Sequence, residues 1–220
     1  MNIRKIYIYV SIAAVTLGIS SCDDYLDKLP DNRMELNSKE KVQQFLVSAY
    51  PDHNPALLAE MYSDNSDEFK VTSWTSAGRF QDQAYAWADI TEISESETPQ
   101  EIWNSLYKAM GTANTALKAI RDNGNTDDYQ PSKGEALLCR AYAAFQLANT
   151  FCMAYDATTA EKYMGVPYPT EPETKVGTTY KRGTLAAFYD QINRDIEEGL
   201  PLITDNYSRP KYHFTRNSAY

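Results

Sequence analysis

The sequence predicts a mainly α fold, built from tetratricopeptide-like helical hairpins with long irregular loops. Several segments repeat apolar residues at spacings of three and four, which is the pattern of amphipathic helices. The alternating pattern of strands is sparse. Residues 63–97 are rich in serine, threonine and acids, and residues 156–183 are rich in proline and glycine, so both stretches are predicted as loops.

Residues 1–21 have the organisation of a lipoprotein signal peptide. Arg4 and Lys5 precede an apolar run, residues 6–19, that carries no charge. A helix that crosses a bilayer needs about 20 apolar residues, and this run is shorter. A positive start followed by a short apolar run is typical of an export signal.

The signal ends in Ile-Ser-Ser-Cys, where a branched apolar residue and two small ones precede Cys22. This is the lipobox pattern, which requires a thiol because the sulfur is the atom that is acylated. We expect Cys22 to be the lipidated N-terminus and residues 22–37 to form a tether, since more than one acyl chain anchors a protein firmly. A plain signal peptide that contains a cysteine by chance is the alternative.

The rest of the chain, residues 38–220, is predicted to form a helical domain. Ser38 and Pro55 begin two short helices, and Thr98-Pro99-Gln100-Glu101 begins a long one with a capping residue followed by proline. That long helix ends at Asp122-Asn123-Gly124, a sequence typical of a C-cap. Its apolar stripe includes Trp103, which we expect in the core.

Two more helices are predicted near Ser132 and at Thr184. Ser132 and Glu135 have the spacing of a second capping box. Cys139 and Cys152 fall on the helix near Ser132, about 20 Å apart at 1.5 Å per residue, which is beyond disulfide reach. They are predicted to be small core residues and not a redox pair or a metal site.

Composition and motifs argue against several function classes. The net charge of −9 disfavours nucleic acid, whose phosphates need a basic surface. Ser105–Lys108 matches the S-x-x-K motif and residues 63–65 match S-D-N, but their order is reversed and no K-T-G follows. The two histidines leave little for a catalytic triad or a zinc site. We expect no enzyme activity, no cofactor and no metal.

Carboxylates before the aromatic loop offer the remaining place for catalysis. Asp64, Asp67 and Glu68 lie close together in the sequence, and a glycosidase needs a pair of carboxyl groups. Acidic chains provide such pairs by chance, so solvated surface or capping roles are the competing interpretation.

Aromatic residues in the 63–97 loop are the candidates for ligand binding. Trp74 lies in the polar sequence TSWTS, where stacking on a sugar ring would explain a large apolar side chain. Burial beneath the loop is the alternative. Tyr85 and Trp87 alternate in AYAWA, so they either contact a ligand or face one side of a short strand and pack in the core.

Five segments in order along the chain resemble the SusD/RagB family of outer-membrane nutrient-binding lipoproteins of Bacteroidetes. They are DDYLDKLP, EIWNSLYKAMGTANTAL, GEALLCRAYAAFQLANTFCMAYDATTAEKYMGVPYPTEPE, YKRGTLAAFYDQINRDIEEGLPLI and PKYHFTRNSAY. The resemblance is to the N-terminal half of such proteins. We therefore expect the chain to be a fragment or a truncated form, with the C-terminal part absent.

The resemblance implies a helical receptor that lies over a SusC-like TonB-dependent outer-membrane transporter. Such receptors capture oligosaccharides, or peptides in some members, for import, and they catalyse no reaction. Asp23 and Asp24 resemble the signal that directs these lipoproteins to the cell surface. The alternatives are a tetratricopeptide-type envelope scaffold that binds only protein partners, and a glycosidase.

Overall fold

The computed structural model describes residues 35–67, 79–93, 96–175 and 177–220. The chain divides into two compact units, Met1–Glu35 and Leu36–Tyr220, and the second contains the described helices. Its regular elements within the described ranges are helices, with one isolated antiparallel bridge between Met164 and Thr184. The predicted mainly α fold class is confirmed.

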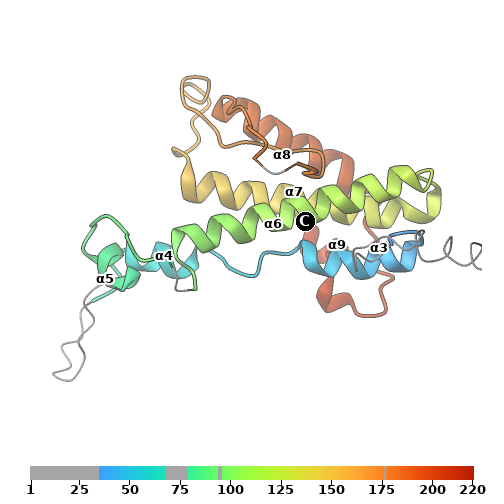
Figure 1. The fold of residues 1–220 in the computed structure, drawn as a ribbon, viewed down its shortest axis with the longest axis horizontal. Coiled ribbons are helices and arrows are strands. Elements are labelled where there is room, and N and C mark those ends of the chain that lie inside the picture. Colours follow the sequence, from blue (N-terminus) through green and yellow to red (C-terminus); the bar gives the residue numbers. More distant parts are fainter. Residues whose placement is uncertain (1–34, 68–78, 94–95, 176) are drawn as a thin grey trace, which may run out of the picture. The chain divides into compact units, whose positions relative to one another are not determined.

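Two long helices form the central hairpin of this unit. Helix α6 (Pro99–Asp122) and helix α7 (Gln130–Phe151) lie side by side (Figure 1) and are joined by a turn that contains η2 (Asp127–Tyr129). The predicted start of α6 is confirmed, because Thr98 Oγ1 accepts a hydrogen bond of 3.3 Å from the Glu101 N–H. Gly124 at the end of α6 has φ of +84°, as expected for a glycine C-cap.

Further helices pack on both members of the hairpin. Helix α8 (Leu185–Gly199) packs against α7 and continues as η3 (Leu200–Leu202). Helix α3 (Lys39–Leu46), followed by η1 (Val47–Ala49), packs mainly against α6. The predicted caps of α3 and α8 are confirmed, because Ser38 accepts from the Lys41 N–H and Thr184 accepts from the Ala187 N–H.

Four short helices complete the described elements. They are α4 (Ala56–Met61), α5 (Phe80–Tyr85), η4 (Pro210–Tyr212) and α9 (Arg216–Ala219). Helix α5 lies inside the 63–97 segment that the sequence predicts as a loop, so that prediction is wrong for these six residues. Phe80 and Ala84 lie four positions apart and therefore share one face of this helix. Both residues are fully buried.

Among the residues that the structure describes, the hydrophobic core has two clusters, one on each part of the α6–α7 hairpin. The first cluster joins α6, α7 and α8 with α4 and α5, and the second joins α6 and α7 with α3. Cys139 is buried in the second cluster, and Cys152 packs partly buried against the first. Both are free thiols. The prediction of a core position is confirmed for Cys139, whereas Cys152 is only partly buried.

The second capping box that the sequence predicts is wrong. Helix α7 begins at Gln130, and Ser132 and Glu135 therefore lie within it and are buried. The Glu135 carboxylate accepts a hydrogen bond of 2.8 Å from the Tyr50 hydroxyl and contacts His213 Nδ1 at 2.8 Å. Glu135 thus links α7 to two distant segments instead of capping a helix.

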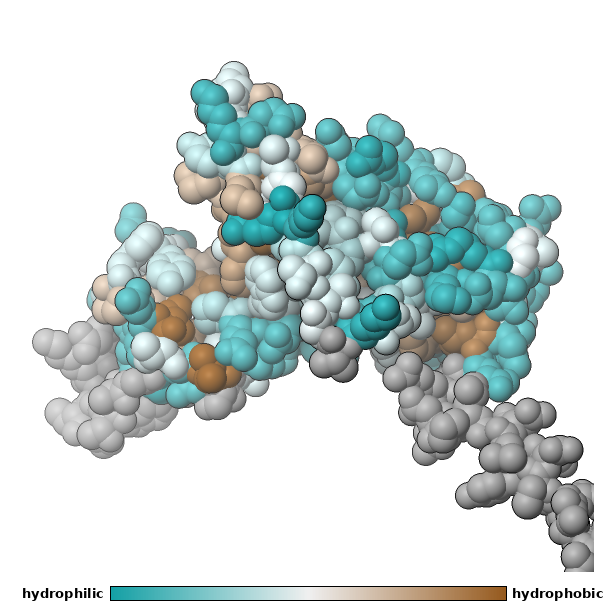
Figure 2. Space-filling view, turned by 45° about the horizontal axis from the view of Figure 1, so that its top comes forward, coloured by the Kyte–Doolittle hydropathy of each residue, from teal (hydrophilic) through white to brown (hydrophobic). Residues whose placement is uncertain are grey.

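Apolar residues form small separate areas among hydrophilic ones on the face shown in Figure 2. In the described ranges, no helix combines the length and the apolar character that crossing a bilayer requires.

Candidate functional site

Tyr85 and Trp87 are the two predicted ligand-binding residues that the structure describes, whereas Cys22 and Trp74 lie outside the described residues. Tyr85 is the last residue of α5, and Trp87 follows two positions later. The predicted short strand is therefore wrong. Packing in the core is also wrong for both rings, because 40% of Tyr85 and 75% of Trp87 is exposed.

The backbone of Trp87 is held in an unusual conformation. Its φ is +54°, in the left-handed region that bulky residues rarely adopt. Such a conformation costs roughly 1–3 kcal/mol and persists where the surrounding structure enforces it, often at functional sites. Here the Trp87 N–H donates to the Ala84 carbonyl at 3.0 Å and the Ala88 N–H donates to the Gln83 carbonyl at 2.9 Å.

The Gln83 side chain fixes the segment that follows. Its Oε1 accepts from the Thr91 N–H at 2.9 Å, and its Nε2 donates to Thr91 Oγ1 at 2.9 Å. Gln83 therefore holds the turn that carries Trp87 in two ways. Its backbone carbonyl accepts from Ala88, and its side chain binds Thr91. A turn fixed in this way loses little conformational freedom when a ligand binds.

Tyr62, at the end of α4, supports the Trp87 ring. The two ring centroids are 5.0 Å apart with an interplanar angle of 55°, a separation at which aromatic rings attract each other. The indole is thus positioned by a neighbouring ring but remains mostly open to solvent. We name the exposed Trp87 ring and the half-buried Tyr62 ring on which it packs the aromatic platform. The exposed face of the Trp87 indole is flat and apolar, which suits the C–H face of a sugar ring.

Trp103 is only partly buried, which corrects the prediction that it is a core residue. Its ring packs on Tyr107 at 4.8 Å and on Phe151 at 5.1 Å, between centroids. It also lines a pocket of about 360 Å³ between α6 and the segment after α7, together with Tyr107, Glu173 and Tyr180. Aromatic rings and the Glu173 carboxylate thus line the same pocket.

Buried polar contacts hold the segment after α7 over α6. The Tyr107 hydroxyl donates to the Pro167 carbonyl at 2.8 Å, and Asn114 Nδ2 donates to the Pro169 carbonyl at 2.8 Å. Arg140 in turn donates to Asn114 Oδ1 at 2.8 Å. Burial raises the pKa of the Tyr107 phenol above its ordinary value, so the hydroxyl stays a donor.

Arg140 and Asp195 form a buried ion pair in the same network. Burial acts to lower the pKa of the Arg140 guanidinium, but the hydrogen bonds and charge of Asp195 outweigh it and the net effect is an increase. Burial also raises the pKa of Tyr168, whose hydroxyl donates to Asp195 Oδ2 at 2.7 Å. The raised pKa values keep Arg140 and Tyr168 protonated near neutral pH, and their hydrogen bonds position the loop.

The S-x-x-K motif has a structural role. Ser105 Oγ accepts hydrogen bonds from the Asp52 N–H at 2.8 Å and the His53 N–H at 3.0 Å, and the residue is only 5% exposed. Lys108 Nζ contacts Asp52 Oδ2 at 2.6 Å. The serine is thus engaged with the backbone and the lysine with an aspartate, so the two do not form a nucleophile and base pair.

Two of the three acidic candidates for catalysis lie at the surface. Asp64 and Asp67 are exposed, as the solvated-surface interpretation predicts, and Glu68 lies outside the described residues. Among the residues that the structure describes, no three histidine, cysteine or acidic side chains are grouped as metal ligands would be.

Comparison with protein families identifies a match over most of the chain. A SusD-like family model, described as "starch-binding associating with outer membrane", matches residues 24–220. No curated protein matches the sequence.

Solved structures share the fold at low sequence identity. A SusD superfamily protein from Bacteroides fragilis has a TM-score of 0.63 and 18% identity, over 84% of this chain and 44% of that one. A SusD-like carbohydrate binding protein from Bacteroides vulgatus has a TM-score of 0.60 and 20% identity, over 83% and 40%. A laminarin binding SusD-like protein has a TM-score of 0.55 and 21% identity, over 83% and 38%. The chain therefore spans about two fifths of the length of the structures that it matches.

Proposed function

The chain belongs to the SusD-like family, described as starch-binding and associating with the outer membrane, and we propose that it is a cell-surface lipoprotein that binds oligosaccharides. In this role Cys22 carries the lipid anchor, and the bound sugar is delivered to a SusC-like TonB-dependent transporter. The family description and the carbohydrate-binding names of two similar structures support the ligand class. Peptides are the alternative cargo, and the role includes no catalytic step.

The observation that carries this proposal is the exposed Trp87 ring on its left-handed turn. Three features combine there: the indole is 75% exposed, its backbone has φ of +54°, and Tyr62 lies 5.0 Å away. An exposed indole contributes little to folding, and the strained turn costs free energy. Stacking on a ligand would account for both features, because a fixed aromatic face binds without first being ordered.

Isothermal titration calorimetry of the purified chain against malto-oligosaccharides and laminarin-derived oligosaccharides tests the proposal. Trp87→Gly removes the ring and also suits the left-handed backbone, so the protein is expected to stay folded. We expect the affinity for the bound glycan to fall about tenfold, which corresponds to losing roughly 1.4 kcal/mol. Trp87→Phe keeps an aromatic face and should retain most of the affinity, and Tyr163→Ala, at a different exposed ring, should change nothing.

Each alternative predicts a different result from the same material. Wild-type affinity in Trp87→Gly would show that the aromatic platform is not the site. Binding of no glycan in the panel, with specific binding to an envelope protein, would favour the scaffold alternative. Release of reducing sugar that Asp67→Asn abolishes would show a glycosidase.

A further inference from the structure

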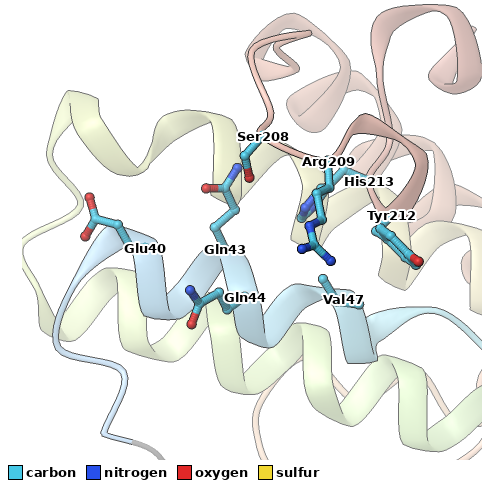
Figure 3. A pocket seen from close by; sticks show the side chains of 8 residues that line it. All are labelled: Glu40, Gln43, Gln44, Val47, Ser208, Arg209, Tyr212 and His213. Atoms are coloured by element: carbon cyan, nitrogen blue, oxygen red, sulfur yellow. The ribbon is translucent and has the colours of Figure 1, made fainter.

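A polar groove lies between α3 and the chain segment that leads into η4 (Figure 3). Its volume is about 500 Å³. One wall comes from α3 and the first residue of η1, and the other comes from residues 208–213. The lining residues are Glu40, Gln43, Gln44, Val47, Ser208, Arg209, Tyr212 and His213. The groove thus joins segments that are far apart in the sequence and lies on different elements from the aromatic platform.

Amide and charged side chains in this groove have unused hydrogen-bonding capacity. Within the described residues, Gln43, Gln44 and Arg209 make no side-chain hydrogen bond or ion pair. Two amides offer donors and acceptors, and the guanidinium offers a fork of donors. These are the groups with which proteins bind hydroxyl and carboxylate groups.

Arg209 differs from the other arginines of the described chain. Arg121 and Arg140 each pair with a carboxylate, and Arg79 pairs with Asp82. The remaining arginines donate to a carbonyl or amide oxygen: Arg182 to Gly165, Arg194 to Gln191 and Arg216 to Ile203. Arg209 alone in these ranges has no such partner. In a chain with a net charge of −9, an exposed, unpaired guanidinium that lines a groove is available to bind an anion.

Contacts of His213 and Phe214 hold the wall that carries Arg209 in place. His213 Nδ1 contacts the buried Glu135 carboxylate at 2.8 Å, and the His213 ring stacks on Tyr207 with centroids 4.3 Å apart. The Phe214 N–H donates to the Tyr50 hydroxyl at 2.6 Å. Burial raises the pKa of the Tyr50 phenol, so the hydroxyl remains protonated. The groove is therefore formed before any ligand arrives, which lowers the entropic cost of binding.

We propose that this groove binds a uronic-acid unit of a glycan, with Arg209 bound to its carboxylate and Gln43 and Gln44 bound to its hydroxyl groups. A guanidinium binds a carboxylate through two parallel hydrogen bonds. Glu40, at the end of the groove away from Arg209 (Figure 3), accepts hydrogen bonds from hydroxyl groups. This inference rests on the proposed function, because it takes a glycan as the ligand, and it adds a second site and an acidic sugar class.

The lining suits a ligand with many hydroxyl groups. Six of the eight lining side chains are polar or charged, and Val47 and Tyr212 are the other two. The polar residues are spread along both walls, which matches the hydroxyl groups around a sugar ring.

Titration calorimetry with tetrasaccharides of galacturonate, mannuronate and hyaluronan, each beside a neutral oligosaccharide of equal length, tests the proposal on the purified chain. We expect at least one uronate to bind. Arg209→Gln should weaken that binding roughly 10- to 100-fold, the effect of losing a charged hydrogen-bonded pair. Lys211→Gln makes the same charge change two residues away, outside the groove lining, and should stay within about twofold of wild type.

The proposals for the groove and for the aromatic platform can be overturned independently of each other. If no uronate binds while neutral glycans bind in a Trp87-dependent way, the groove proposal is wrong and the proposed function stands. If uronates bind through Arg209 but Trp87→Gly has no effect on any glycan, the aromatic platform is wrong and the groove stands. Equal weakening by Arg209→Gln and Lys211→Gln would show general charge attraction and would overturn the groove site. A thermal melt of each variant confirms that it is folded.

Discussion

Arg140 and Asp195 are joined by two hydrogen bonds between α7 and α8, from Nε to Oδ2 at 2.6 Å and from Nη2 to Oδ1 at 2.8 Å. Their side chains are only 7% and 3% exposed. Arg140 Nη1 also donates to Asn114 Oδ1, and the Tyr168 hydroxyl also donates to Asp195 Oδ2. Through these hydrogen bonds the buried pair connects α6, α7, α8 and the segment that follows α7.

Asp195→Asn should lower the free energy of unfolding by about 3–5 kcal/mol, because it leaves the buried guanidinium without its counter-charge. Urea denaturation followed by circular dichroism measures this loss. Glu198→Gln is the matched control, since it breaks the half-exposed Lys133–Glu198 pair between the same two helices and should cost at most about 1 kcal/mol. Similar losses in both variants would contradict the structural role of the buried pair.

Gly134 permits the close approach of α7 and α8. A Cβ atom at this position would lie 2.8 Å from the Gly199 carbonyl oxygen and 2.8 Å from Leu202 Cβ. Gly134→Ala should therefore destabilise the protein by about 1–3 kcal/mol. Gly111→Ala, on α6, adds a methyl group that meets nothing within 4 Å and should stabilise it by roughly 0.5–1 kcal/mol.

Thermal melts of the two glycine variants should shift in opposite directions. A melting temperature of Gly134→Ala at or above that of wild type would mean that the two helices do not meet as closely as described.

Buried tyrosines should make the protein sensitive to alkaline pH. Burial raises the pKa of Tyr107 and Tyr168 above the ordinary value of about 10. The unfolded chain releases these protons first, so the stabilising contribution is fully present below about pH 10 and is lost as the pH rises further. Urea denaturation at pH 8 and at pH 11 should show lower stability at pH 11.

Tyr107→Phe separates this effect from general charge repulsion. The variant loses the hydrogen bond to the Pro167 carbonyl, so it should be about 1 kcal/mol less stable than wild type at pH 8. Because one titrating group is gone, its stability should fall less between pH 8 and pH 11. An equal fall in both proteins would show that Tyr107 does not contribute to the alkaline sensitivity.

Lipidation at Cys22 is tested in cells. We expect an alkyne analogue of a fatty acid to label the protein, and Cys22→Ser to abolish the label. Cys152→Ser, at a partly buried free thiol, is the control and should leave labelling unchanged. Persistent labelling of Cys22→Ser would place the modification elsewhere.

Local signals in the sequence predicted the helix starts well. Ser38, Thr98 and Thr184 each cap a helix in the structure, because a cap depends on residues only two or three positions apart. The prediction of a Ser132–Glu135 capping box was wrong because the partners of Glu135 are distant in the sequence. Glu135 is bound to Tyr50 and His213, and contacts between such distant positions leave no local pattern.

The sites were harder to predict than the fold. The sequence singled out Trp87 as an aromatic residue in a loop, but its exposure depends on a left-handed turn and on Gln83, which local patterns did not indicate. Arg140 carried a usable signal, since it is a charged residue on a helix otherwise rich in alanine and leucine. The groove at Arg209 had none, because its two walls are separated by most of the chain.

A crystal structure of the chain with the oligosaccharide that binds in titration tests the central claim most directly. We predict a sugar ring over the exposed face of Trp87, in van der Waals contact at about 4 Å, with the Tyr62–Trp87 pair retained. A bound glycan that leaves the Trp87 indole without any ligand contact would contradict the account.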